Sequence, residues 1–282
     1  MGAPHARTRG IGPQGPSRST PLDAAEPLLN PPSPASPASL DEVRAATATI
    51  EGWLSDDQLV RLHEAARAVP SGGRIVEIGS FRGRSTIVLA ASAPQVAEVV
   101  AIDPHAGNDR GPQELDGYAE AASEDHEVFL ANLEGAGVRD AVRHVRKRSD
   151  DALVDVPGDI DLLYIDGAHR YQPARDDIVR WGARVRPGGT LLIHDAFSSV
   201  GVTLALGRTM FSSRRFRYVG RSRSMAEYRA TPPAGKDRLA SVGAQVAQLP
   251  WFGRNLLVKV LLVAHLGRVA RLLGHDGETW PY

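Results

Sequence analysis

The segment RIVEIGSFRGRST, residues 74–86, decides the fold of this 282-residue chain. It opens with an apolar run of strand character that ends at Gly79, and a second glycine, Gly83, follows four residues later. Glycines directly after a strand mark a turn that another group approaches closely. The spacing differs from the G-x-G-x-x-G pattern of dinucleotide-binding folds, because the first two glycines of that pattern are two residues apart.

The chain on the C-terminal side of this segment alternates strands and helices. Such alternation implies right-handed crossovers and a largely parallel sheet, which is an α/β fold. The apolar strands do not alternate with polar residues, as expected when both faces of a sheet are covered. We expect a closing strand pair around 221–223, strands at 74–78, 98–102, 142–146, 160–165 and 190–194, and helices at 83–92, about 117–136, 149–154, 172–183 and 199–211.

The flanking segments suggest three parts. Residues 1–39 are rich in Pro, Ala and Ser, and we expect a disordered leader. Residues 40–230 form the α/β domain, beginning with two helices whose N-caps we expect at Ser39 and Ser55 because acidic residues follow each serine. Residues 231–282 read as a linker and a C-terminal helical extension.

Charge and composition narrow the range of partners. Lys+Arg and Asp+Glu both number 33, so there is no global field that would attract nucleic acid, and none is expected as a partner. The chain contains no cysteine, which excludes disulfides and a thiol nucleophile. The N-terminus has no apolar run of the kind that a signal peptide needs, so we expect a cytoplasmic protein. No uninterrupted apolar run reaches the length of a transmembrane span.

The C-terminal extension is strongly apolar between 251 and 274. Lys259, His265, Arg268 and Arg271 interrupt it and do not gather on one helical face. We therefore expect a helix that packs on the core or in a homodimer interface, with contact to a membrane surface as the alternative.

Polar residues follow the expected strands at one edge of the sheet. In doubly wound sheets, ligands bind outside the carboxyl ends of the strands, near the point where the strand order reverses. Asp103 follows the second strand, about 20 residues after Gly83, and a carboxylate there can accept both hydroxyl groups of a ribose. This spacing suits NAD and S-adenosylmethionine equally well. The remaining polar residues at this edge are Glu77, Ser149, Asp150, Asp166, His169, His194 and Asp195.

Four segments together resemble the class I S-adenosylmethionine-dependent methyltransferases. They are VEIGSFRGRST, AIDPH, LLYIDGAHRYQPARDDIVRW and RPGGTLLIHDAF, and they resemble in particular the group with an Asp-Gly-x-His-x-Tyr segment after strand four. The resemblance covers about residues 52–230. It implies a doubly wound, mostly parallel, seven-stranded Rossmann-like methyltransferase sheet, here with helical N- and C-terminal extensions. It also implies methyl transfer from S-adenosylmethionine, and we expect O-methylation of a small molecule or a sugar hydroxyl.

The same resemblance assigns roles to individual residues. Asp103 would hold the ribose hydroxyls, and Asp166 would lie near the transferred methyl and the amino group of the cofactor. Glycines 188 and 189 have a structural role in the turn before strand five. The other implied cofactor-binding residues are Glu77 and Gly79 at the methionine end, Ser80 and the backbone of Gly83 and Ser85 closing over it, and Ser149 and Asp150 near the adenine.

The implied chemistry is an in-line displacement at a sulfonium methyl, which needs an acceptor held in line. His169 is the candidate base, because an imidazole titrates near neutral pH and this one lies beside Asp166; pairing with a carboxylate is its other possible role. Asp166 and Asp195 are tentative Mg²⁺ ligands. His194 stands where some relatives place an acid, and imidazole is a poorer ligand for Mg²⁺ than carboxylate.

Three further residues and one loop have plainer interpretations. Asp176 and Asp177 are expected on an exposed helix face or at a cap, and Trp181 in the core. Residues 104–117 form a polar loop that is either a lid over the site or an ordinary surface connection.

Two other classes of function remain open. An NAD-dependent oxidoreductase could use a similar sheet, although the glycine spacing and the lack of a Tyr-x-x-x-Lys set disfavour it. A non-catalytic cofactor-binding scaffold, attached to a membrane or partner through its C-terminal helix, is the second alternative.

Overall fold

The computed structural model describes residues 37–106 and 118–274, which lie in one compact unit. The strands are β1 (Arg74–Ile78), β2 (Glu98–Ile102), β3 (Val142–Val145), β4 (Ile160–Ile165), β5 (Val185–Ile193), β6 (Arg217–Ser222) and β7 (Met225–Arg229). The helices are α1 (Leu40–Thr47), α2 (Asp56–Arg67), α3 (Arg84–Ser92), α4 (Tyr118–Gly135), α5 (Tyr171–Gly182), α6 (Val200–Thr209), α7 (Gly235–Val246), α8 (Leu249–Val263) and α9 (Gly267–Leu272), with 3₁₀ turns η1 (Arg139–Ala141) and η2 (Ala152–Val154).

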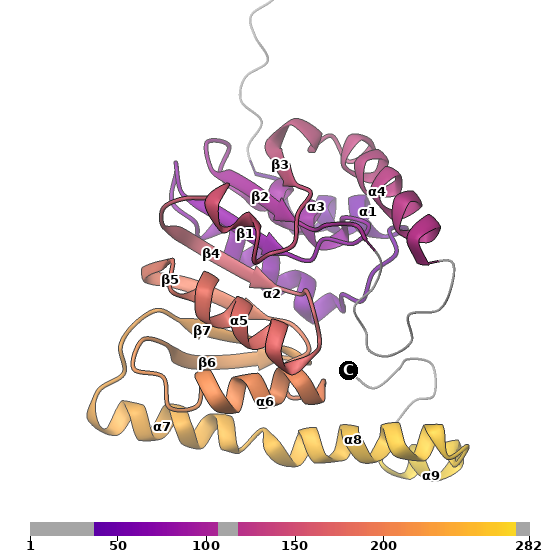
Figure 1. Ribbon diagram of the computed structural model, residues 1–282, viewed down its shortest axis with the longest axis vertical. Helices are drawn as coiled ribbons and strands as arrows, with labels where there is room; N and C mark the ends of the chain where they lie inside the picture. The colour runs from indigo at the N-terminus through magenta and orange to yellow at the C-terminus, as the bar shows by residue number, and fades with distance from the viewer. Residues whose placement is uncertain (1–36, 107–117, 275–282) are drawn as a thin grey trace, which may run out of the picture. The chain divides into compact units, whose positions relative to one another are not determined.

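The strands form a single sheet in the order β3-β2-β1-β4-β5-β7-β6 (Figure 1). The five strands from β3 to β5 are parallel, and β7 is antiparallel to both β5 and β6. The order reverses between β1 and β4, so the crevice between the carboxyl ends of these two strands is the expected ligand position. The doubly wound, mostly parallel arrangement is as predicted.

Most predicted elements lie within two residues of the observed ones. The main differences are β5, which already begins at Val185, and the predicted helix 149–154, of which only the 3₁₀ turn η2 forms. Two predictions fall largely outside the described residues. They are the disordered leader at 1–39, of which residues 1–36 are not described, and the polar loop at 104–117, of which residues 107–117 are not described.

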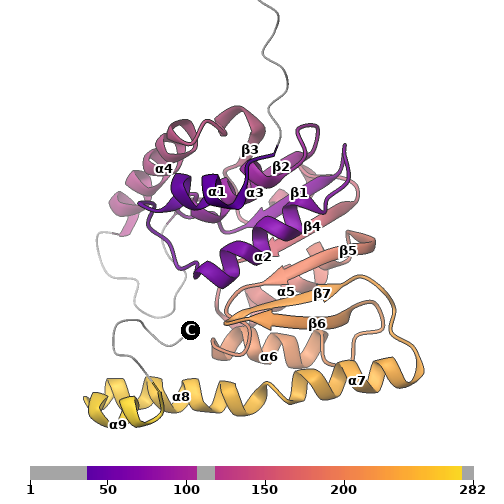
Figure 2. The same ribbon diagram turned by 180° about the vertical axis from the view of Figure 1, so that it is seen from behind.

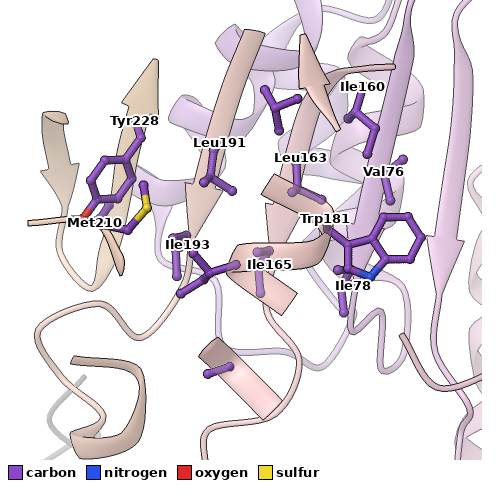
Figure 3. Close-up of a cluster of buried hydrophobic side chains, with 14 of the residues drawn as sticks. Val76, Ile78, Ile160, Leu163, Ile165, Trp181, Leu191, Ile193, Met210 and Tyr228 are labelled. Carbon is purple, nitrogen blue, oxygen red and sulfur yellow. The ribbon is translucent and has the colours of Figure 1, made fainter. Parts of the chain in front are cut away.

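Side chains of the central strands belong to two hydrophobic clusters, one on each face of the sheet, because neighbouring residues on a strand point to opposite faces. Val76 and Ile78 pack with Leu163, Ile165 and residues of α5 and α6, as the close-up in Figure 3 shows. On the other face, Ile75 packs with residues of α1, α2, α3 and α4. Figures 1 and 2 show these helix layers from opposite sides. Trp181 is completely buried, as predicted.

The two N-terminal helices begin at the predicted serines. Ser39 and Ser55 each form a capping box, in which the serine side chain accepts from a backbone N–H that Glu42 or Gln58 carries. These caps satisfy backbone donors that the first helical turn leaves without partners. They fix the entry of α1 and α2 onto the sheet face that carries Ile75 and α3.

The C-terminal extension is helical, as predicted, and packs beside β6 through α7 and α8. Tyr218 N donates to Ser241 Oγ at 3.0 Å, and the guanidinium carbon of Arg221 lies 3.9 Å from the centroid of the Trp251 ring. Trp251 and Phe252 are half-buried against the cluster that contains Trp181. The extension is therefore attached to the domain, although most of its other large apolar side chains are exposed.

Candidate active site

The turn after β1 lies directly against the loop after β4. Gly79 has φ +86°, and a Cβ built there would lie 2.3 Å from the carbonyl oxygen of Asp166. Only glycine fits, because any side chain would collide with the neighbouring backbone and would be strained at this φ. The amide of Asp166 in turn donates to the carbonyl of Ile78 at 2.8 Å. These contacts bring the turn after β1 and the Asp166–His169 loop together at the switch point.

Asp103 holds the turn after β1 in place. One carboxylate oxygen accepts from the amides of Ser80 and Phe81 at 2.8 and 3.0 Å, and the other accepts from the amide of His105 at 2.8 Å. The turn ends at Gly83, which has φ +88° and caps α3. The predicted cofactor residues Ser80, Gly83 and Asp103 therefore belong to one hydrogen-bonded unit at the ends of β1 and β2.

Glu77 lies beneath this turn. Its side chain is completely buried, and it accepts hydrogen bonds from the hydroxyls of Ser85 and Thr86 at the start of α3. Burial raises the pKa of the Glu77 carboxyl to about 8, although the two hydroxyls partly oppose this shift. Glu77 and Ser85 therefore secure the turn from below, and their direct contact with a cofactor stays a prediction.

Ser149 and Asp150 follow β3, where the resemblance places the adenine. The Ser149 hydroxyl donates to Asp177 in α5, and Asp150 lies at the surface with Arg148 as its partner. Asp177 is only 5% exposed, so the prediction of an exposed or capping position for it was wrong. Burial raises the pKa of Asp177 to about 6, with the Ser149 hydroxyl opposing the shift. The error arose because α5 turns this carboxylate inward, toward the loop after β3.

The loops after β4 and β5 bring two acids and two histidines together. His169 Nε2 lies 2.6 Å from Asp195 Oδ2, and His194 Nδ1 lies 3.1 Å from Asp166 Oδ1 and 3.6 Å from Asp195 Oδ1. His194 and Asp195 are almost completely buried, whereas the His169 side chain is 21% exposed and the Asp166 side chain 26% exposed. His169 and Asp166 thus offer the accessible atoms, and the buried pair supports them.

The neighbours of Asp195 favour its ionised form. Burial alone would raise its pKa, but the hydrogen bond from His169 and the charges of His194 and Lys259 hold the pKa well below the ordinary value of an aspartate. Because Asp195 binds Nε2 of His169, Nδ1 is the ring nitrogen left to accept a proton. This pairing has the form of a base oriented by a carboxylate.

Sequence reasoning missed three residues that shape this half of the site. The Tyr164 hydroxyl donates to Asp166 Oδ2 at 2.9 Å. Lys259 of α8 donates to the carbonyl of Ser198 at 3.1 Å, in the loop after β5. Gly201 lies so close to the Asp166–His169 loop that a Cβ there would be 2.2 Å from the carbonyl oxygen of His169. Tyr164 lies two residues before the predicted Asp166, so both side chains point to the same side of the sheet and this contact could have been predicted from the spacing. The contacts of Lys259 and Gly201 depend on the tertiary fold.

The donor set does not form a ready metal site. In the described ranges 37–106 and 118–274, no group of three or more His, Asp or Glu side chains is arranged to hold a metal ion. Mg²⁺ prefers an octahedron of oxygen ligands. Here His194 stands between the two carboxylates of Asp166 and Asp195 and pairs with both. The Mg²⁺ ligands predicted at Asp166 and Asp195 therefore stay a prediction.

Three histidines form a cluster next to Asp103. The ring centroids of His105, His126 and His144 lie 5.0 to 5.2 Å apart, and the Phe129 ring packs against His105 and His144. Burial and the two neighbouring histidines lower the pKa of His144 to about 4. Burial likewise lowers the pKa of His105 and of His126. The cluster is therefore neutral at pH 7 and packs as an apolar support for the ribose end of the predicted cofactor site.

The strand order, the switch-point crevice and the helices on both faces define the fold of the class I S-adenosylmethionine-dependent methyltransferases. Known structures share this fold. The O-methyltransferase NovP has a TM-score of 0.54 and 18% identity, with 68% of this chain and 98% of that chain covered. A protein from Corynebacterium glutamicum has a TM-score of 0.53 and 14% identity, with 68% of this chain and 89% of that chain covered. Both the fold class and the resemblance to this class are confirmed.

The sequence comparisons place the methyltransferase signature in the centre of the chain. Residues 76–196, from β1 to the loop after β5, match the family model described as a methyltransferase domain. An uncharacterized protein of Acanthamoeba polyphaga mimivirus is 30% identical over 125 residues, which are 43% of this chain and 50% of that protein. The chain thus spans about half the length of this curated relative. All the predicted site residues lie within the matched segment.

Proposed function

We propose that this protein binds S-adenosylmethionine and transfers its methyl group to a hydroxyl of a small molecule or sugar. One observation carries the proposal: the switch point joins a glycine turn, held by Asp103, to a histidine–carboxylate pair, His169 and Asp195. The first group suits a ribose-bearing cofactor, and the second suits removal of a proton from a hydroxyl. The methyltransferase domain match at 76–196 supports the same function.

The residues fit an adenosyl cofactor. The backbone turn after Gly79, the N-terminus of α3 after Gly83 and the carboxylate of Asp103 line one edge of the sheet. When bound, the cofactor supplies an electrophilic methyl group on a sulfonium. The protein then has to hold the acceptor in line, exclude water and remove the hydroxyl proton. Nδ1 of His169 would take that proton, and Asp195 would stabilise the resulting imidazolium.

The acceptor must reach His169 from the outer side of the loop. Behind the loop, the cavity lined by Asp166, His169, His194 and Val202 has a volume of only about 10 Å³. Such a volume holds a single water molecule and no substrate. The exposed part of His169 is therefore the side that an acceptor would meet.

Binding calorimetry tests the cofactor. We expect micromolar affinity for S-adenosylhomocysteine and no binding of NADH; the reverse result would support an NAD-dependent oxidoreductase and overturn the proposal. A transfer assay with labelled methyl donor and a panel of phenolic, sugar and small hydroxyl acceptors then tests the reaction. Binding of S-adenosylhomocysteine without transfer to any acceptor in a lysate of the source organism would favour the non-catalytic scaffold.

Chelation tests the predicted Mg²⁺ ligands separately. If His169 alone removes the proton, turnover with EDTA present equals turnover without it. If Asp166 and Asp195 hold Mg²⁺ in the working enzyme, EDTA abolishes turnover and added Mg²⁺ restores it. In that case, Asp195→Asn loses the response to Mg²⁺, whereas Asp176→Asn, an acid on the neighbouring helix, keeps it.

A further inference from the structure

From residue 239 onward, the outward face of α7 and α8 is apolar. Over residues 239–264, every exposed residue is Ala, Gly, Leu, Pro or Val. Large side chains dominate this face, and Leu239 and Val263 near its two ends are 75% and 71% exposed. The other large members are Val246, Leu249, Leu256, Leu257 and Val260, each 39% to 56% exposed. We call these seven side chains the apolar face. Soluble proteins rarely leave a continuous apolar surface of this kind without a partner.

The polar side of the same helices is turned toward the domain. Gln245 accepts from the Tyr228 hydroxyl at 3.1 Å, Gln248 accepts from Arg221 Nε at 2.7 Å, and Lys259 donates to Ser198 O at 3.1 Å. Ser241 and Asn255 are also buried. These bonds fix the rotation of α7 and α8, so the apolar face cannot turn inward without leaving buried polar groups unpaired. Figures 1 and 2 show the two helices running end to end beside β6 and α6.

Length and composition alone would allow these helices to cross a membrane. Gly235–Val263 is a helical stretch of 29 residues, and an 18-residue window within it has a mean hydropathy of 1.2 with only 11% of that window buried. A core helix of similar composition would be buried. However, Gln245, Gln248 and Lys259 bind the domain, so the stretch lies along the domain and offers one side to a flat surface. That is the geometry of a helix lying in the plane of a bilayer surface.

The distribution of charge favours a lipid surface over a second copy of the chain as the partner of the apolar face. Lys236 and Arg238 precede the apolar face, Arg268 and Arg271 follow it, and Asp237 is the sole acid among residues 235–274. Two copies packed face to face would bring basic ends together in either relative orientation, which is unfavourable. Anionic lipid headgroups would instead pair with both basic ends while the apolar face enters the acyl boundary.

We propose that the apolar face of α7 and α8, together with the basic residues Lys236, Arg238, Arg268 and Arg271, docks the protein on the surface of an anionic lipid bilayer. The site residues are not part of this surface. Docking is therefore independent of the proposed methyl transfer, and failure of one leaves the other standing.

Vesicle cosedimentation of the full-length chain tests the proposal. We expect binding to vesicles of equal parts phosphatidylcholine and phosphatidylglycerol, much weaker binding to phosphatidylcholine alone, and weaker binding as salt rises. Changing Leu257, Val260 and Val263 together to Ser should weaken binding about tenfold or more, because three buried side chains are lost. Arg268→Glu with Arg271→Glu should weaken binding to the anionic vesicles about tenfold or more and leave the weak binding to neutral vesicles unchanged.

A matched control changes exposed apolar residues elsewhere. Val96→Ser with Val154→Ser removes side chains that are 66% and 82% exposed outside α7 and α8, and should leave vesicle binding unchanged. Circular dichroism and binding of S-adenosylhomocysteine report whether each variant keeps its fold. No sedimentation of the wild-type chain with either vesicle overturns the proposal. So does a stable dimer, seen by light scattering, that the Leu257, Val260 and Val263 variant abolishes while vesicle binding stays unchanged.

Discussion

Glu77 in β1 and Asp195 after β5 are both carboxyl groups almost fully buried at the same edge of the sheet. The partners of Glu77 are neutral hydroxyls, and burial raises its pKa to about 8. Asp195 faces His169, His194 and Lys259, and these hold its pKa below the ordinary value despite similar burial. The half of the site after β1 and β2 therefore surrounds its carboxyl groups with backbone amides and hydroxyls, whereas the half after β4 and β5 pairs them with histidines and a lysine. Burial alone does not decide the charge of a group; its neighbours do.

If the two halves of the site have separate roles, the largest loss of turnover comes from a change in the half after β4 and β5. His169→Gln should lower turnover about a hundredfold or more, because a positioned base contributes that much. Affinity for S-adenosylhomocysteine should stay within about twofold, since the predicted cofactor residues are untouched; steady-state kinetics measures turnover and calorimetry measures the affinity. The control is His126→Gln, which changes a histidine outside this half. Unchanged turnover in the His169 variant would remove it as the base.

The second prediction concerns the point where the two halves touch. Gly79→Ala should lower the free energy of unfolding by about 3 kcal/mol or more, because the new methyl group meets the carbonyl of Asp166 at 2.3 Å and the backbone is left-handed. Gly137→Ala is the matched control. Gly137 also has a positive φ, +67°, but a Cβ there meets nothing within 4 Å, so the cost should be about 1 kcal/mol. Urea denaturation measures the free energy of unfolding of both variants. Equal losses would show that the turn after β1 shifts to accommodate the new methyl group.

The third prediction isolates the cofactor half. Asp103→Ala should weaken S-adenosylhomocysteine binding about tenfold to a hundredfold, because the predicted hydrogen bonds to the ribose and the observed one from the Ser80 amide are lost. Turnover at saturating donor should change only a few-fold. Asp103→Asn keeps an acceptor oxygen and should fall between wild type and the alanine variant. A loss of turnover with unchanged affinity would contradict the separation of roles.

The last prediction concerns the histidine cluster and the dependence of stability on pH. The pKa of His144 is about 4 in the folded protein and 6.5 ordinarily, so between these values the unfolded chain binds a proton that the folded chain does not. The free energy of unfolding should therefore fall as the pH drops from 6.5 to 4. His144→Leu should remove at most about 1.4 kcal/mol per pH unit from that slope, a slope to which His105 and His126 also contribute.

Denaturation at several pH values measures this slope. Glu77 changes the dependence of stability on pH in the opposite direction from His144. Its carboxyl keeps a proton in the folded state up to about pH 8, so its contribution to stability is lost as the pH rises from 4.5 to 8. Glu77→Gln should therefore flatten the upper part of the profile and leave the effect of His144→Leu intact. An identical slope in wild type and the His144 variant would show that this ring titrates normally.

Much of this molecule could be read from local patterns. Apolar runs without alternation predicted the buried parallel strands, and the serines before acidic residues predicted the starts of α1 and α2. Asp103 could be located because a polar residue after a parallel strand must lie at the ligand edge of the sheet. Asp177 was misjudged because two adjacent acids on a helix look alike in sequence, and only the loop after β3 shows which one faces inward.

The sequence by itself determined the strand–helix alternation, the glycine turn and the edge at which the polar residues gather. These features depend on residues close together in the chain. The tertiary structure alone decided that Asp195 pairs with His169, that Lys259 reaches the loop after β5, and that α8 turns its polar side inward. Those outcomes depend on contacts between segments far apart in sequence. Their energies come from burial and charge that exist only once the sheet and its helices are assembled.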